Sequence, residues 1–432
     1  MNYLLYGLNS SKINKFIQKA NYKKVNDING NLMLIEENAF SNYLALKEYL
    51  SKKDIFIDFV NQKKYNDEVY NLEYTMGLSF HIVFKFNGVF YGDILNADMD
   101  LLKIIYDAIF KFGFILRYPD INSLYIRYVG LIPARIIRDY NLSLEEYVND
   151  FSCVLFINKP KNITSFDVVS DIRRLFGIKR VGHTGTLDPL ATGVMIVTIG
   201  RACKIVDLLV AYNKEYIASV KLGIKTDTYD ITGNVISSKD KAISVEKLKK
   251  ALNSFKKTYY QEVPIYSAIK VDGKKLYDYA RSNLDVSLPK KLVTINNIEL
   301  LDMNGDSFRF KADVSKGCYI RSLIVDIASS LDTYATMTDL VRVRQGNISI
   351  NDTQTLDDIK NNDFIIHSID EVLNYDVIVV SSSLLFKIKN GNVIPNIWNV
   401  KDKVIFKDNT NKIIGIYEVF NDNELKCFKN FI

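Results

Sequence analysis

The spacing of apolar residues predicts the main elements in the middle of the chain. After an apolar run at residues 152–160, residues 165–176 carry a helical stripe, which predicts an amphipathic helix capped by Thr164 or Ser165. The stripe consists of Val168, Val169, Ile172, Leu175 and Phe176. Further on, strand-like segments alternate with Gly-Asn and Asn-Gly turns, and helices are expected at 245–255 and 320–331. This order favours a mixed sheet with packed helices over a doubly wound parallel sheet.

The pattern changes on both sides of this region. Residues 1–150 predict a mixed α/β unit, with a strand at 80–86, a helix at 99–112 and a short closing helix at 142–148 whose Ser143 and Glu146 form a capping box. Residues 376–432 consist of short apolar segments, among them 384–388, separated by Asn, Gly and Asp turns, which predicts a small closed or nearly closed β-barrel. The fold class is therefore α+β, with domains expected at 1–150, 151–375 and 376–432.

Composition excludes several classes of protein. The 432 residues are 48% hydrophobic and 25% charged, as in folded globular chains. The sequence contains no run of 18 apolar residues, so no membrane span is expected. The first residues lack the pattern of a signal peptide. Four scattered cysteines and three histidines form neither a disulfide framework nor a metal-ligand cluster. We expect a cytoplasmic, reduced protein without metal that acts as a monomer.

Charge gives a weaker indication. The net charge of +6 is compatible with a nucleic-acid partner. Residues 256–291 hold eight Lys/Arg against four Asp/Glu, interleaved with tyrosines, which suits a phosphate backbone and exposed bases. A solvated surface with tyrosines packed beneath it is the alternative.

The densest polar motif is the segment GHTGTLDPLATG at residues 182–193. Its glycines allow close approach of a ligand, and Pro189 disfavours a helical conformation at Asp188. On spacing alone, Asp188 could also be the N-cap, and Pro189 the first residue, of a short helix. A phosphate-binding loop lacks the expected GxxxxGK[ST] pattern.

This motif resembles the signature of the TruB family of tRNA pseudouridine synthases, and further segments of that family follow in the same order. They are LFINKP at 155–160, KEY at 214–216, TDT at 226–228 with Asp230, YSAIK at 266–270, GKKLY at 273–277, KGCYIR at 316–321 and VRVRQG at 341–346. The resemblance covers residues 151 to 350 closely and the remainder weakly. It implies a pseudouridine synthase domain followed by a PUA-like β domain that grips the T-arm of tRNA.

The resemblance also assigns an activity. Isomerising a T-loop uridine, at position 55, breaks the N1–C1′ bond and joins C5 to C1′, so no atoms are gained or lost and no cofactor is needed. Asp188 matches the catalytic aspartate, which acts on the sugar or on the base. Arg321 matches an active-site arginine that would hold Asp188 charged. The presence of Asp188, Tyr216 and Arg321 together favours an enzyme over a tRNA-binding or folding module with dispensable catalysis.

The other site residues are also implied by the resemblance. Tyr216 would stack on the target base, Tyr319 would line the site, and His183 would support flipping of the uridine out of the folded RNA. Lys159 borders the site, with structural support as a second interpretation, and Val343 takes the position of an aliphatic residue against the uracil. Candidate contacts to the RNA backbone are Lys179, Arg180, Lys274 and Lys275.

Residues 112–148 resemble a different family, the VanY-like zinc D-alanyl-D-alanine carboxypeptidases, through FGFILRYP, YIRYVG and the closing helix. The ligands of that family are missing: Tyr74 and Tyr125 stand in place of histidines, His81 in place of the aspartate, and Asn122 near the expected glutamate. Neutral tyrosine is a poor zinc ligand. We therefore expect a degenerate scaffold without peptidase activity, with a chance resemblance as the alternative.

Overall fold

The computed structural model describes residues 22–26, 32–52, 55–60, 78–86, 89–91, 107–120, 123–128, 130–239, 242–282 and 284–431. The chain divides into two compact units. The first consists of Met1–Phe151 together with Ile172–Lys179, and the second of Ser152–Asp171 and Arg180–Ile432. The domain boundaries expected at 150/151 and 375/376 stay predictions.

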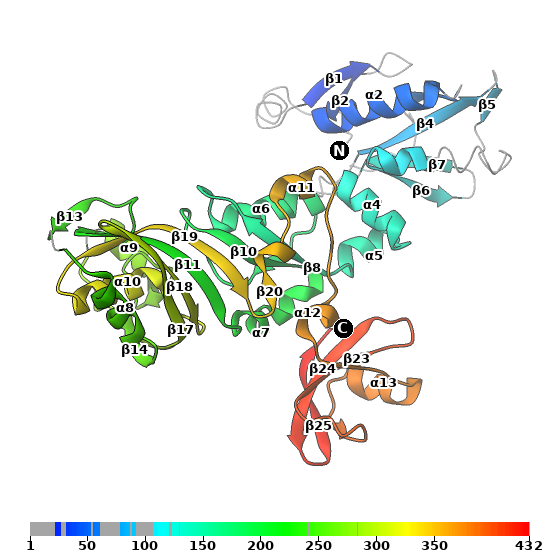
Figure 1. The fold of residues 1–432 in the computed structure, drawn as a ribbon. Helices are drawn as coiled ribbons and strands as arrows, with labels where there is room; N and C mark the ends of the chain where they lie inside the picture. The colour runs from blue at the N-terminus through cyan, green and yellow to red at the C-terminus, as the bar shows by residue number, and fades with distance from the viewer. Residues whose placement is uncertain are drawn as a thin grey trace. The chain divides into compact units, whose positions relative to one another are not determined.

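The first unit contains an antiparallel sheet and several helices (Figure 1). The sheet has the order β3-β4-β7-β6, with β5 beside β4, and a separate hairpin joins β1 to β2. The strands are β1 (Tyr22–Asn26), β2 (Leu32–Glu36), β3 (Ile55–Val60), β4 (Leu78–Phe86), β5 (Val89–Tyr91), β6 (Phe114–Asp120) and β7 (Ser123–Tyr128). Its helices include α2 (Glu37–Ser51), α4 (Leu131–Asp139) and α5 (Leu144–Asn149).

The structure confirms two expectations for this unit. The strand expected at 80–86 lies within β4. Helix α5 begins after Ser143, whose side chain accepts from the backbone of Glu146 while the Glu146 carboxylate accepts from the backbone of Ser143. Of the helix expected at 99–112, residues 107–111 are described and helical, and residues 99–106 lie outside the described residues.

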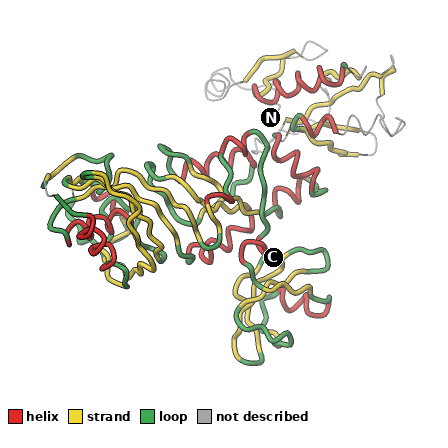
Figure 2. The backbone as a smooth tube through the Cα atoms, viewed as in Figure 1, coloured by secondary structure: helices red, strands yellow, loops and turns green. Residues whose placement is uncertain are grey.

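A large mixed sheet forms the centre of the second unit (Figures 1 and 2). Its order is β14-β17-β18-β11-β19-β10-β8, with β9 beside β10 and β20 beside β19. The strands are β8 (Cys153–Lys159), β9 (Val181–His183), β10 (Thr192–Ile199), β11 (Lys214–Leu222), β14 (Thr258–Glu262), β17 (Lys290–Asn304), β18 (Ser307–Val314), β19 (Ala335–Gln345) and β20 (Ile348–Ser349). β10 and β19 run parallel, and their antiparallel neighbours make the sheet mixed, as the sequence predicts.

The three helices expected in this part of the chain are present as α6 (Ser165–Phe176), α8 (Val245–Ser254) and α10 (Ile320–Ser330). Helices α8 and α10 pack on the sheet. Leu248 and Leu252 of α8 and Leu323 of α10 pack into one apolar core with Phe310 of β18. Burial of side chains of this size stabilises the fold by about 1.5–3 kcal/mol each. The shorter elements are η2 (Gly200–Ile205), α7 (Val206–Val210), β12 (Ile224–Thr226), β13 (Val235–Ser238), β15 (Lys270–Val271), β16 (Lys274–Lys275), α9 (Leu276–Arg281), η3 (Ile350–Asp352), α11 (Leu356–Lys360) and α12 (Ile369–Leu373).

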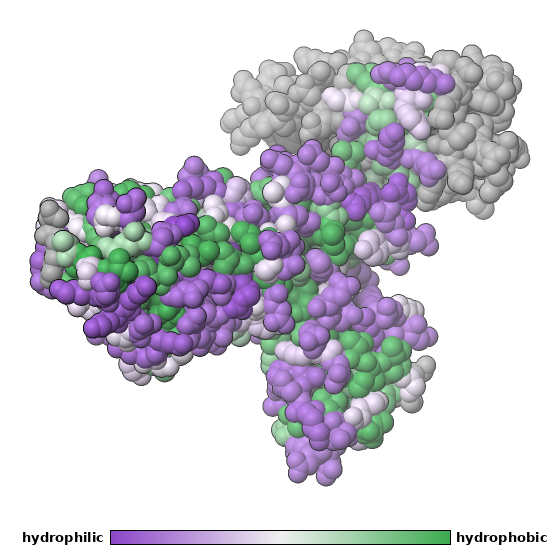
Figure 3. Space-filling view, viewed as in Figure 1, coloured by the Kyte–Doolittle hydropathy of each residue, from purple (hydrophilic) through white to green (hydrophobic). Residues whose placement is uncertain are grey.

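The C-terminal region forms its own five-stranded sheet with the order β21-β23-β24-β25-β22. Its elements are β21 (Asp376–Val379), α13 (Ser382–Lys389), β22 (Ile394–Pro395), β23 (Lys403–Lys407), β24 (Ile413–Asn421) and β25 (Glu424–Asn430). Among these described strands β21 and β22 stand at the two ends of the order, so the sheet is open rather than fully closed. Apolar residues also reach the surface here (Figure 3), and Phe386 is 72% exposed.

One expectation for this region is wrong. Residues 384–388, expected as a strand, belong to helix α13. Leu384 and Ile388 are four residues apart and therefore share one helix face, and both pack into the apolar core of the C-terminal sheet. Phe386 lies on the exposed face of the helix.

Candidate active site

The polar motif forms a loop between β9 and β10, with Asp188 at its centre. In this fully described segment a turn, and not a helix, follows Pro189, because the backbone N–H of Ala191 donates to the carbonyl of Asp188 at 3.0 Å. The interpretation of Asp188 as the N-cap of a short helix is therefore wrong. The side chain of Asp188 stays 31% exposed.

Two buried polar side chains hold the loop from one side. Ser165, at the start of α6, accepts from the backbone N–H of Leu187 at 2.9 Å and donates to its carbonyl at 3.1 Å. The Lys159 ammonium donates to the carbonyls of Pro160, Pro189 and Ala191 at 2.8–3.4 Å. Burial lowers the pKa of Lys159 to about 8, with Arg342 adding to the shift and Asp188 opposing it. Lys159 therefore supports the backbone on both sides of Asp188.

The β19 strand holds the loop from the other side. Buried Arg342 donates from Nε to the carbonyl of Val194 at 2.6 Å and from Nη2 to that of Gly185 at 3.3 Å. Gln345 donates to the Thr184 hydroxyl at 2.8 Å. Gly193 has φ +103°, and a Cβ there would lie 2.3 Å from the carbonyl oxygen of Arg342, so only glycine fits where β10 meets β19.

Arg321 and Asp188 form a two-point ion pair. Arg321 Nε lies 2.9 Å from Asp188 Oδ2, and Nη2 donates to Oδ1 at 3.1 Å. Such a fork-shaped contact fixes both the distance and the plane of the carboxylate. The pair joins positions 133 residues apart in the chain, as the family resemblance implies.

The Arg321 guanidinium is itself held by three further oxygens. Nη1 donates to the carbonyl of Thr228 and Nη2 to that of Tyr266, both at 3.0 Å. Asp230 Oδ2 lies 3.9 Å from Nη1. The Asp230 carboxylate is buried and accepts from the Thr228 hydroxyl and from the backbone of Thr232, each at 3.0 Å. Arg321 is therefore pre-positioned for Asp188.

Burial raises the pKa of Asp188 above its ordinary value, and the nearby Asp230 carboxylate adds to the rise. Arg321 and Lys159 act in the opposite direction and do not fully offset burial. The expectation that Arg321 holds Asp188 charged stays a prediction, because the ion pair favours the charge and burial opposes it. A carboxylate kept partly dry is more basic than one in water.

Two tyrosines lie in the elements that build this site. Tyr216 on β11 is buried in the same apolar core as Leu187 and Leu190 of the loop. Tyr319 is the N-cap residue of α10, two residues before Arg321. Burial raises the pKa of the Tyr319 phenol, with Asp188 also raising it and Arg321 lowering it, so its ring lies within electrostatic reach of the ion pair.

His183 and Val343 are placed less directly. Among the described residues, the Nδ1 atom of His183 is buried without a hydrogen-bond partner, and burial lowers the pKa of the ring. Val343 is half-buried and is the extra residue of a β-bulge, because Tyr216 pairs with Arg342 while Glu215 pairs with Arg344. Among the described residues, the groups that contact Asp188 and Arg321 do not include Val343. Its role stays a prediction.

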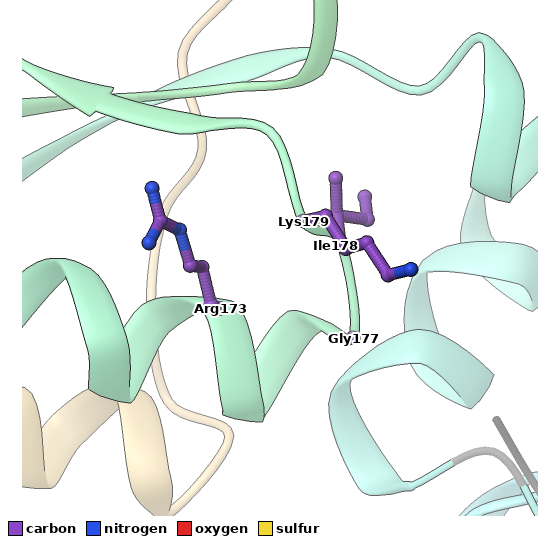
Figure 4. A pocket seen from close by; sticks show the side chains of 4 residues that line it. All are labelled: Arg173, Gly177, Ile178 and Lys179. Carbon is purple, nitrogen blue, oxygen red and sulfur yellow. The ribbon is translucent and has the colours of Figure 1, made fainter. Parts of the chain in front are cut away.

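The candidate backbone-contacting cations lie in two places. Lys274 and Lys275 form β16, which pairs with β15 just before α9. Lys275 donates to the Tyr277 hydroxyl at 2.8 Å, and Lys274 Nζ lies 4.9 Å from the centre of the Tyr279 ring. Lys179 and Arg180 are exposed after α6. Lys179 lines a shallow hollow with Arg173, Gly177 and Ile178 (Figure 4).

Sequence reasoning missed several supporting residues. Arg342, Gln345 and Lys214 hold backbone carbonyls with buried side chains, and Lys214 donates to the carbonyls of Val210 and Tyr212 at 2.8 and 2.6 Å. Leu340 is a buried aliphatic residue in the core that contains Tyr216 and Leu187. Arg342, Gln345 and Lys214 occur in motifs matched by the resemblance, but nothing in the local pattern indicates that a charged side chain there is buried.

Neither expected absence is contradicted within the part of the chain that the structure describes. There, no three His, Cys, Asp or Glu side chains are placed to hold a metal ion, and no helix is long and apolar enough to cross a membrane. Tyr74 and Asn122, which replace ligands of the carboxypeptidases, lie outside the described residues. His81 and Tyr125 lie opposite each other on β4 and β7.

A loop carboxylate with a raised pKa, paired with a buried arginine, makes this loop a candidate functional site. The N-terminal domain model of the TruB family pseudouridylate synthases matches residues 173–320. The tRNA pseudouridine synthase B of Fusobacterium nucleatum is 42% identical over 287 residues, 64% of this chain and 99% of that protein. That of Clostridium tetani is 42% identical over 270 residues, 61% of this chain and 91% of that protein.

The chain therefore belongs to the TruB family of pseudouridine synthases. Among solved structures, an H/ACA ribonucleoprotein bound to a substrate RNA containing 2′-deoxyuridine has a chain that is 20% identical, with a TM-score of 0.49, over 67% of this chain and 87% of that chain.

Proposed function

We propose that this chain isomerises uridine to pseudouridine in tRNA and that Asp188 is its catalytic residue. The observation that carries the proposal is the two-point contact between Asp188 and the buried Arg321, in a member of the TruB family. The loop around Asp188 is held by Lys159, Ser165 and Arg342 through backbone contacts. Pre-positioning of this kind lowers the cost of bringing reacting groups together.

The site residues divide the work in this proposal. The target uridine, at position 55 of the T-loop, leaves its stack before any atom of it can be reached, and His183 supports that step. Tyr216 stacks on the base, and Tyr319 lines the site. Asp188 acts while ionised, as nucleophile or as base, and Arg321 favours the ionised form. The products contain the same atoms as the substrate.

Other parts of the proposal concern RNA binding. The C-terminal sheet grips the T-arm as a PUA-like domain, and Lys179, Arg180, Lys274 and Lys275 contact phosphates. Such contacts position the RNA without reading its sequence. We infer a cytoplasmic monomer. We also infer that residues 1–150 are a degenerate carboxypeptidase-like scaffold without peptidase activity, on the basis of their sequence resemblance and replaced ligands.

The test is the substitution Asp188→Asn in the full-length protein. The amide keeps the shape of the carboxylate but cannot ionise, so pseudouridine formation on an unmodified tRNA transcript should fall by at least about 1,000-fold. The affinity for tRNA should stay within about 3-fold, which is less than 1 kcal/mol. Site mapping of pseudouridine and a binding titration measure the two quantities.

Asp339→Asn is the matched control, because Asp339 is a partly exposed carboxylate that forms an ion pair with Lys161, away from Arg321. It should leave turnover unchanged. Comparable turnover by Asp188→Asn and by the wild type would show that the assignment of Asp188 is wrong. Absence of pseudouridine with the wild type, despite tight tRNA binding, would favour the RNA-folding module.

A further inference from the structure

Gln261, on the edge strand β14, contacts the first turn of the helix that carries Arg321. Its Oε1 atom accepts the backbone N–H of Tyr319 at 2.8 Å. Tyr319 is the N-cap residue of α10, where backbone N–H groups have no partner within the helix. Gln261 is only 1% exposed, so water does not compete effectively for this contact.

A chain of hydrogen bonds fixes the orientation of the Gln261 amide. The Tyr259 hydroxyl donates to Asp326 Oδ2 at 2.9 Å, so its oxygen is free to accept from Gln261 Nε2, also at 2.9 Å. Burial and Asp326 raise the pKa of Tyr259, which keeps the phenol protonated as a donor. With Nε2 directed at Tyr259, Oε1 is directed at Tyr319.

The network therefore attaches α10 to β14 at two points. One is the N-cap residue Tyr319, and the other is Asp326, two turns further along the helix. Because two points on one helix are held by one strand, sliding and rotation of α10 along the sheet are both restrained. Arg321, the second residue of the helix, moves with its first turn.

The segment that follows β14 also contacts the Arg321 guanidinium. Five residues after Gln261, the carbonyl of Tyr266 accepts from Arg321 Nη2 at 3.0 Å. A displacement of β14 relative to α10 would thus alter both the backbone position of Arg321 relative to the sheet and the position of the Tyr266 carbonyl, which accepts from it. The two contacts to Asp188 at 2.9 and 3.1 Å depend on this relation.

We propose that Gln261 is a positioning residue, whose carboxamide holds the start of α10 so that Arg321 meets both oxygens of Asp188. This inference rests on the proposed function. It assigns Gln261 no contact with substrate. A misplacement of about 1 Å in a group of this kind costs about 100-fold in rate.

The experiment compares Gln261→Met with Gln354→Met in the full-length protein. Methionine has a similar size to glutamine, so packing is largely kept. It cannot make the hydrogen bonds of the amide. Gln354 is the control, because its amide makes hydrogen bonds of the same kind, to the backbone of Ile365 at 2.8 and 2.9 Å, away from the Arg321 pair. The readouts are kcat and KM for pseudouridine formation across pH, with thermal melting by circular dichroism.

Gln261→Met should lower kcat by about 10- to 100-fold, keep KM within about 3-fold and move the acid limb of kcat to higher pH, because a less well placed Arg321 favours the anion less. Gln354→Met should keep kcat and the acid limb. Should Gln261→Met not fold, Tyr259→Phe provides the second test. It removes the hydroxyl that donates to Asp326 and accepts from Gln261 Nε2, while Gln261 Oε1 can still accept from Tyr319. It should lower kcat by about 3- to 10-fold.

The results distinguish failure of the proposed function from failure of the inference on Gln261. A wild type without pseudouridine synthase activity overturns the proposed function and this inference together. An active wild type with Gln261→Met equal to Gln354→Met in kcat and acid limb overturns the inference alone. A lower melting temperature with unchanged kcat also overturns it, since that is the result of a purely structural role.

Discussion

At the scale of single residues, Asp188 is under two opposing influences. Burial disfavours its charge, while Arg321 favours it through two contacts. The net pKa is raised, so Asp188 is easier to protonate than an aspartate in water. A carboxylate of this kind is a stronger base, and its activity is more sensitive to acid.

Activity should accordingly be lost on acidification at a higher pH than for an ordinary aspartate, whose pKa is about 3.9. The sign follows from the ionised form being the active one: a raised pKa moves half-maximal kcat upward. Arg321→Gln removes the favourable cation and should move this limb higher still, with kcat lower by about 100-fold or more at neutral pH. Profiles of kcat between pH 4 and 8 measure both effects.

Arg321→Lys is the control for charge alone. It keeps the positive charge but loses the second N–H group of the fork, so its limb should fall between those of the wild type and Arg321→Gln. Coincident acid limbs for the wild type and Arg321→Gln would mean that Asp188 is not the group whose ionisation limits kcat.

The sequence indicates these residues unequally. Asp188 stands in one continuous motif with its glycines, and the local pattern alone makes it a candidate. Arg321 is reached only through the family resemblance, because its contact to Asp188 crosses 133 positions. Gln261 is indicated neither by the local pattern nor by the segments on which the family resemblance rests. A glutamine in a strand gives no sign that its amide binds the start of a helix.

At the scale of elements, the joint between β10 and β19 depends on Gly193. Gly193→Ala places a Cβ 2.3 Å from a backbone oxygen of Arg342, and backbone cannot move aside cheaply. We expect a loss of at least about 3 kcal/mol in the free energy of unfolding, together with loss of activity, since the strands also hold the Asp188 loop. Urea denaturation measures the stability.

Gly273→Ala is the matched control. Gly273 also has a positive φ, +81°, but a Cβ there has nothing within 4 Å. Only backbone strain remains, at about 1–2 kcal/mol. Equal destabilisation by the two substitutions would show that the contact with Arg342 does not decide the requirement for glycine.

Local patterns predict elements well where caps and apolar stripes agree. α5 has the expected capping box, and Thr164 caps α6 through Asp167, while Ser165 is taken up by the loop at Leu187. The sequence predicts a strand at 384–388 where the structure has helix α13, because short apolar runs are compatible with both a helix and a strand. The pairing of β10 with β19 lies outside any local window, since their partners Gly193 and Arg342 are 149 positions apart in the chain.

At the scale of the whole molecule, the end of α6 and the segment after it belong to the first unit. In that unit the Tyr147 hydroxyl of α5 donates to the carbonyl of Phe176 at 2.6 Å, and both side chains are buried. Removal of residues 1–150 therefore removes part of the packing around residues 172–179, although the shortened protein keeps Asp188 and Arg321.

We expect a protein spanning residues 152–432 to be about 2–4 kcal/mol less stable than one spanning 131–432, because it loses the buried Tyr147 and its hydrogen bond. Turnover at low temperature should agree within about 3-fold, since Asp188 and Arg321 lie in the other unit. Urea midpoints and kcat measure the two quantities. Tyr147→Phe in the full-length chain should cost only about 1 kcal/mol. Equal stability of the two shortened proteins would contradict the role of α5.

The discontinuous first unit has a consequence for synthesis on the ribosome. Domains generally fold from the N-terminus as they emerge. Here the first unit includes residues 172–179, so it cannot be complete when its own last continuous residue, Phe151, has left the exit tunnel. β8, a strand of the large sheet, is the next segment to emerge, before residues 172–179 do, and its partner β10 follows within 40 residues. The nascent chain must therefore finish one unit while the other has already begun.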